Sequence, residues 1–171
     1  KSRLAEECYA RSLRGGYRGS YALATDAARD TPLGALAHLT SPASLTPAGG
    51  PVPAFHSIVA AMGLDGTRRH ILFIDDAHLL DRTSAIVVGR LLDCGGVFLI
   101  ATVCDGGARG PLAADLERRT SVMRVELREL SLRHTEELLG HVLGWPIQGR
   151  TVAQLYQKTR GNLLYLYEIV S

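Results

Sequence analysis

The chain has 171 residues, a length typical of one ordinary domain and too short for a regulator of several domains. Hydrophobic residues make up 46% and charged residues 21%, ordinary globular values that exclude a disordered chain. The formal net charge of +2 is too small to indicate, by itself, binding to nucleic acid or to an anionic membrane.

Cysteine spacing and hydropathy favour the cytoplasm. Cys8, Cys94 and Cys104 are odd in number and lack CxxC spacing, which favours neither a disulfide framework nor a zinc site. No apolar stretch approaches the roughly 18 residues of a membrane span, and no signal-peptide run follows the first residues. We therefore expect a cytoplasmic chain with no membrane partner. The missing initiator Met predicts a trimmed chain or a fragment.

The first third of the chain predicts one helix, one strand and a long connection. Apolar residues at helical spacing predict a helix over residues 2–14 that ends at the glycine pair after it. A short apolar run predicts a buried strand over residues 20–25. The Pro- and Gly-rich stretch from Thr31 to Pro53 predicts an irregular connection, with one helical turn at 33–39.

The middle of the chain alternates helices with apolar strands. Helices are expected at residues 54–63 and 84–92, with a glycine-rich turn and a short helix at 112–116. Uninterrupted apolar runs predict buried strands at 71–75 and 97–103, and alternating residues predict an edge strand at 122–127. Such an order indicates an α/β fold with a parallel sheet.

Beyond Leu130 the pattern is helical throughout. Helices are expected at residues 132–143, 151–159 and 162–170. The sequence therefore predicts an α/β core at 1–129 and the start of a helical subdomain at 130–171.

The most specific pattern is a buried strand followed by the acidic pair Asp75-Asp76. Ligands of open α/β sheets bind at the carboxyl ends of the strands, where this pair stands. Such a pair is typical of a Walker B element. Asp75 is predicted to hold Mg²⁺, largely through its water shell, and Asp76 to polarise an attacking water. A strand that ends in an ordinary turn is the plainer interpretation, but adjacent carboxylates are costly to place there without a cation.

The chain begins with Lys1-Ser2 at the head of an amphipathic helix. This is what remains of GxxxxGK[S/T] when the phosphate loop is cut just before its lysine. In an intact loop the lysine reaches the β and γ phosphates of ATP and the hydroxyl ligates Mg²⁺. Lys1 and Ser2 are therefore candidate ATP-binding residues and Ser2 a candidate Mg²⁺ ligand, although the glycines and the strand before them are missing.

Two further residues lie where such a site would place polar groups. Thr102 ends the strand at 97–103, where a sensor of the γ-phosphate is expected; an ordinary core strand is an equally good interpretation. His78 is a candidate to orient Asp75 or Asp76, but a histidine in a first helical turn is more often a packed or capping residue.

Four segments resemble the AAA-type signalling ATPase region of large LuxR-type transcriptional regulators, which belong to the STAND class of P-loop ATPases. They are Asp75–Asp81, Ala101–Val103, Gly161–Val170 and Thr31–Leu39, so the resemblance runs nearly end to end.

The resemblance implies a switch whose ATP or ADP state sets the packing of a helical lid, self-association, and exposure of a DNA-binding helix-turn-helix domain that this chain lacks. Gly161 and Asn162 would present groups near the nucleotide. Two departures imply slow hydrolysis or none, since Cys104 stands where the family commonly has arginine and Leu163 where it has proline.

Other function classes stay open at this stage. A degenerate P-loop fold that serves only as a scaffold for protein interaction is favoured by Cys104 and Leu163, whereas Asp75-Asp76 favours the ATPase. A phosphoacceptor receiver domain ranks low, because its acidic pair would follow its first strand. A DExH-type helicase is excluded, because the chain is too short and lacks an arginine-rich motif.

Overall fold

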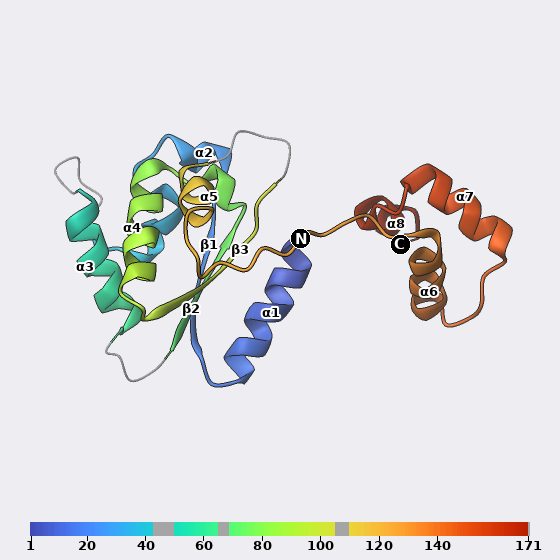
Figure 1. Ribbon diagram of the computed structural model, residues 1–171, viewed down its shortest axis with the longest axis horizontal. Coiled ribbons are helices and arrows are strands. Elements are labelled where there is room, and N and C mark those ends of the chain that lie inside the picture. Colours follow the sequence, from blue (N-terminus) through green and yellow to red (C-terminus); the bar gives the residue numbers. More distant parts are fainter. Residues whose placement is uncertain (43–49, 65–68, 105–109, 171) are drawn as a thin grey trace. The chain divides into compact units, whose positions relative to one another are not determined.

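The computed structural model of the chain describes residues 1–42, 50–64, 69–104 and 110–170. It divides into two compact units, Lys1–Met123 and Arg124–Ser171 (Figure 1). The predicted connection at 31–53 and the predicted glycine-rich turn lie partly outside the described residues.

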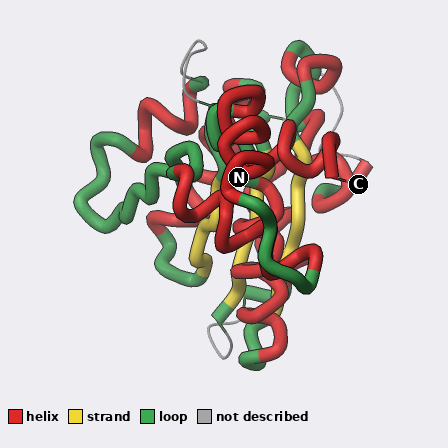
Figure 2. The backbone as a smooth tube through the Cα atoms, turned by 90° about the vertical axis from the view of Figure 1, so that its right-hand side faces the viewer, coloured by secondary structure: helices red, strands yellow, loops and turns green. Residues whose placement is uncertain are grey.

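Within the described residues, the first unit is built on a parallel sheet of three strands. Its strands are β1 (Arg18–Leu23), β2 (His70–Asp75) and β3 (Val97–Ala101), in the order β1-β2-β3. Figure 2 draws the strands in yellow. Leu23 pairs with Asp75 and Ile74 with Ala101, so all three strands end at one edge of the sheet. The predicted α/β class and its parallel sheet are confirmed.

Helices cover both faces of this sheet (Figure 1). The α-helices of the first unit are α1 (Ser2–Arg14), α2 (Asp26–Arg29), α3 (Pro51–Met62), α4 (Arg82–Asp93) and α5 (Pro111–Leu116), with 3-10 turns η1 (Gly34–Leu39) and η3 (Ala77–Leu79). Local chemistry sets several of their ends. Pro51 begins α3, Gly63 ends it at φ +60°, and the Asp81 side chain caps α4.

The central strand β2 is buried along its whole length, as its apolar run predicts. Leu72 and Ile74 join the core beneath α3 and α4, together with Ile58 and Val88. On the opposite face, Phe73 packs against Tyr9 of α1 at a ring distance of 5.8 Å. The sheet is thus a two-sided core layer that fixes the position of α1.

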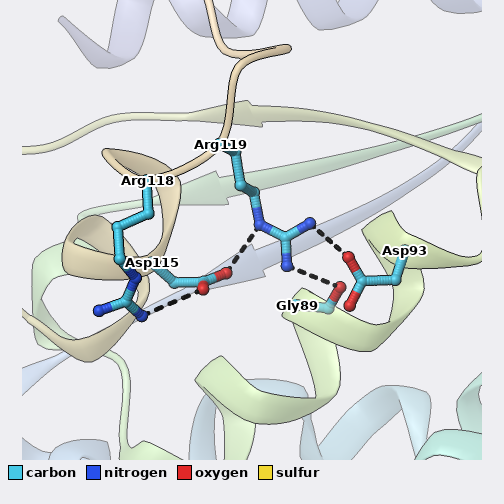
Figure 3. A network of polar contacts seen from close by, with 5 residues as sticks. All are labelled: Gly89, Asp93, Asp115, Arg118 and Arg119. Carbon is cyan, nitrogen blue, oxygen red and sulfur yellow. Dashed lines mark hydrogen bonds and ion pairs between the residues drawn. The ribbon is translucent and has the colours of Figure 1, made fainter.

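A polar network joins the C-terminal ends of α4 and α5 (Figure 3). Arg119 donates to Asp115 at 2.8 Å, to Asp93 at 2.6 Å and to the carbonyl of Gly89 at 3.2 Å. The hydrogen bond from Arg119 is the main cause that lowers the pKa of Asp115 below its usual value. The network therefore ties α5 to the side of the core that α4 covers.

The predicted edge strand at 122–127 is wrong, because the structure assigns no strand to those residues. Its alternating residues Val125 and Leu127 are 63% and 50% exposed. Strand residues need a paired neighbour to satisfy their backbone, and β3 pairs with β2 alone within the described residues. The alternating pattern at 122–127 is present in the sequence, but within the described residues no neighbouring strand pairs with it.

The second unit consists of α6 (Leu132–Leu143), α7 (Gly149–Thr159) and α8 (Leu163–Val170). The three predicted helices are confirmed to within two residues at each end. Ser131 caps the start of α6, and Gly144 ends it in the left-handed region. Across the described part of the chain, no helix is both long and apolar enough to span a bilayer.

Candidate functional site at the carboxyl edge of the sheet

The structure gathers five of the residues singled out in the sequence at the carboxyl edge of the sheet. Lys1 precedes α1 and Ser2 begins it, Asp75 ends β2 and Asp76 follows it, and Thr102 follows β3. Hydrogen bonds connect these elements directly, across 73 residues between Ser2 and Asp75 and 27 between Asp75 and Thr102. The cluster forms because α1 packs on the sheet with its N-terminus at this edge.

Asp75 is the buried acceptor at the centre of the cluster. It is 8% exposed, and its Oδ1 accepts hydrogen bonds from Ser2 Oγ at 3.0 Å and from Thr102 Oγ1 at 2.5 Å. The other carboxylate oxygen, Oδ2, takes part in none of the hydrogen bonds made within the described residues. Two hydroxyl donors therefore fix the carboxylate and leave one oxygen for a further partner.

Asp76 differs from its neighbour in both backbone and exposure. Its backbone adopts the left-handed conformation at φ 52° and ψ 43°, which is uncommon for a residue other than glycine. Its N–H donates to Thr102 Oγ1 at 2.9 Å, while its side chain is 47% exposed. The two adjacent carboxylates thus meet different surroundings, one buried and bonded and the other open to solvent.

The segment after β3 meets the site at three successive residues. Lys1 Nζ donates to the carbonyl oxygen of Val103 at 3.0 Å, beside the contacts of Thr102. The N–H of Cys104 donates to His78 Nδ1 at 3.4 Å, and that nitrogen lies 4.0 Å from Asp76 Oδ1. Thr102, the predicted sensor, therefore contacts the acidic pair, and the next residue, Val103, contacts the predicted lysine.

The donor set suits a cation that takes few protein ligands. No group of three or more His, Cys, Asp or Glu side chains able to hold a metal occurs in the part of the chain that the structure describes. Mg²⁺ keeps several waters and binds through one or two carboxylates together with substrate phosphates. Asp75, whose Oδ2 makes no hydrogen bond within the described residues, and the Ser2 hydroxyl fit that pattern. They are too few to hold a cation by protein ligands alone.

Asp81 is a key residue that the sequence interpretation missed. It is 7% exposed and accepts hydrogen bonds from Ser84 N at 2.9 Å, from Ser84 Oγ, and from Leu33 N at 3.2 Å. Leu33 lies in the left-handed region at φ 63°. The Asp-x-x-Ser spacing signals the helix cap. Nothing in the sequence signals the bond to Leu33, which joins the segment Thr31–Leu39 to the acidic loop.

Gly161 and Asn162 lie in the second unit, where both have local contacts. Gly161 has φ +77°, and a Cβ at this residue would collide with the carbonyl oxygen of Leu130. The Asn162 side chain accepts a hydrogen bond from Leu164 N at 3.0 Å and so caps α8. These contacts account for both residue types without a ligand, and their binding role stays a prediction.

No family model, curated protein or solved structure matches the chain, so the comparisons assign it no family. The geometry of the carboxyl edge is therefore what points to a function.

Proposed function

We propose that the chain is the core of a P-loop ATPase that works as an ATP-controlled switch in a transcriptional regulator of the LuxR type. The observation that carries this proposal is the 3.0 Å hydrogen bond from Ser2 Oγ to Asp75 Oδ1. It joins a lysine-serine pair at a helix N-terminus to a carboxylate at a strand end, which are the two halves of a site for Mg²⁺ and phosphate. The small net charge supports a nucleotide, rather than DNA, as the direct ligand.

One edge of β3 has no paired strand within the described residues, and it supports a phosphate loop before Lys1. Phe98 of β3 is 64% exposed, although β3 is apolar on both faces like a strand from the middle of a sheet. A further parallel strand leading into α1 would pair with the outer edge of β3, widen the apolar face on which Phe98 lies, and end beside Lys1. The loop between that strand and α1 would supply the backbone N–H groups that hold the phosphates.

Each polar residue of the edge has one role in this proposal. Asp75 and Ser2 would hold Mg²⁺, which neutralises charge on the phosphate oxygens. Lys1 exchanges the carbonyl of Val103 for phosphate oxygens, with which a lysine forms stronger, charge-assisted hydrogen bonds. The half-exposed carboxylate of Asp76 accepts a hydrogen bond from the attacking water and orients it.

The alternative is a P-loop fold that binds no nucleotide productively and serves as a scaffold. It is favoured by Cys104, since the residue whose N–H bonds to His78 carries no positive charge for the γ-phosphate. The reducing cytosol that we propose for either function is compatible with three cysteines that form no disulfide.

Three variants of the full natural protein separate these functions. Asp76→Asn is expected to lower ATP turnover by about 100-fold or more while binding of a fluorescent ATP analogue is unchanged. Lys1→Ala is expected to weaken both binding and turnover, because it removes the charge that meets the phosphates. Asp93→Asn is the matched control, since Asp93 is an exposed aspartate at the C-terminal end of α4, paired with Arg119.

Each outcome of these measurements tests a different part of the proposal. Unchanged turnover in the Asp76 variant would remove that residue from its role. Unchanged binding in the Lys1 variant would overturn the phosphate site altogether. Binding without turnover in the parent protein would favour a switch that works by binding alone, and no binding at all would favour the scaffold.

A further inference from the structure

Thr102 has a buried hydroxyl that serves two consecutive aspartates. The residue is 7% exposed and follows the last residue of β3. Its Oγ1 donates to Asp75 Oδ1 and accepts from the backbone N–H of Asp76 at 2.9 Å. One side chain therefore contacts a buried carboxylate and the backbone of its half-exposed neighbour.

A hydroxyl has a single hydrogen to donate, and this one goes to Asp75. Phosphate oxygens are acceptors, so Thr102 cannot donate to a γ-phosphate while it donates to Asp75. We propose that Thr102 is a positioning residue for the acidic pair rather than a contact for the phosphate. This inference depends on the proposed ATPase only for its effect on turnover, since the positioning itself is a property of the chain.

The backbone of Thr102 holds the same turn. Its carbonyl oxygen accepts from Ala77 N at 2.8 Å, and its N–H donates to the carbonyl of Ile74 at 3.0 Å. Asp76 between them has the unfavourable left-handed conformation, which persists only where neighbouring contacts stabilise it. Because the hydroxyl receives the Asp76 N–H, removing it takes away one of the contacts that maintain this conformation.

The carboxylates of Asp75 and Asp76 consequently have different roles. Thr102 and Ser2 together occupy Oδ1 of Asp75 and leave Oδ2 for a hydrated cation. The same hydroxyl anchors the backbone of Asp76 at the point from which its side chain extends toward solvent. A change at Thr102 should therefore alter the response to Mg²⁺ and the catalytic rate more than the affinity for the nucleotide.

The test compares Thr102→Val, which removes the hydroxyl, with Thr102→Ser, which retains it, in the full natural protein. Thr135→Val is the matched control, because Thr135 is a buried threonine of the second unit. The first readout is hydrogen exchange at the amide of Asp76 without nucleotide, measured by mass spectrometry with fragmentation to single amides. We expect about tenfold faster exchange in Thr102→Val, and near-parental exchange in Thr102→Ser and the control.

The second readout is steady-state ATP turnover as a function of Mg²⁺. We expect Thr102→Val to raise the Mg²⁺ concentration for half-maximal rate and to lower kcat, with KM for ATP nearly unchanged. Unchanged exchange at Asp76 in Thr102→Val would overturn the inference. So would a rise in KM alone, which would identify a phosphate contact. If the protein bound no ATP, the proposed function would be refuted. The positioning role would still be tested, because hydrogen exchange at Asp76 is measured without nucleotide.

Discussion

The two units of the chain are stabilised by polar contacts of different reach. In the first unit, several buried or part-buried side-chain hydrogen bonds join residues far apart in sequence, as in Ser20–His70 across 50 residues and Leu33–Asp81 across 48. In the second unit, side-chain hydrogen bonds at the helix ends join residues two to four apart, as in Asn162–Leu164 and Thr159–Leu155. The first unit is therefore cross-linked by polar groups, whereas helix ends in the second are shaped locally.

The apolar interior of the first unit likewise joins more elements than that of the second unit. The core of the first unit gathers residues from α3, α4, α5 and the sheet. In the described part of the second unit the buried apolar side chains are Leu139, Val152 and Leu166, while Leu163, Leu164 and Tyr167 of α8 are more than half exposed. A polar substitution in the first unit should thus disturb several elements together, and one in the second unit should act on a single helix.

The largest expected effect tests this difference at two helix caps. Asp81→Ala should destabilise the first unit by about 3 kcal/mol, because it removes a cap and leaves the buried N–H of Leu33 without its acceptor. Ser131→Ala removes a cap with one local partner in the second unit and should cost about 1 kcal/mol.

Urea unfolding measures both losses. Circular dichroism follows the whole chain, and the fluorescence of Trp145, the single tryptophan, follows the second unit. Equal losses of unfolding free energy in the two variants would show that the hydrogen bond from Leu33 adds nothing to the helix cap at Asp81. The proposed difference between the units would then be contradicted.

The same difference explains what the sequence could predict. Helix ends set by neighbouring residues were predictable, since Ser131 and Gly144 bound α6 where the periodicity of its residues places it. The acidic pair and Thr102 were found because they follow apolar strands, and parallel strands bring their ends to one edge. The double use of the Thr102 hydroxyl and the bond from Leu33 to Asp81 were not predictable, because they depend on how distant segments pack.

An intermediate effect is expected from acid at the amino edge of the sheet. His70 is 4% exposed and contacts Ser20 Oγ at 3.0 Å. Burial, and then the charge of Arg18, lower the pKa of His70, and the backbone of Met62 opposes part of this shift. Below pH of about 6.5, the usual pKa of histidine, the unfolded chain therefore binds more protons at this residue than the folded chain.

Stability from His70 is thus complete above that pH and decreases as the pH falls toward the lower pKa of the folded state. We expect the urea midpoint of the parent to drop between pH 7.5 and 5.5. His70→Gln, which does not titrate, should show a smaller drop. The same drop in both proteins would place the acid sensitivity elsewhere.

The smallest expected effect concerns Thr135, which reverses the situation of Thr102. Both threonines are buried, but the Thr135 hydroxyl has no hydrogen-bond partner among the residues that the structure describes. An unpaired buried hydroxyl costs free energy, and valine has the same shape without it. Valine and threonine have similar helix propensities, so the position in α6 adds little to the difference.

Thr135→Val should therefore stabilise the second unit by about 1 kcal/mol, measured as a higher urea midpoint of Trp145 fluorescence. Thr135→Ser keeps the hydroxyl, loses a methyl group, and should destabilise the same unit. A loss of stability in Thr135→Val would mean that the hydroxyl is satisfied in solution, and the second unit would then depend, like the first, on a polar contact in its interior.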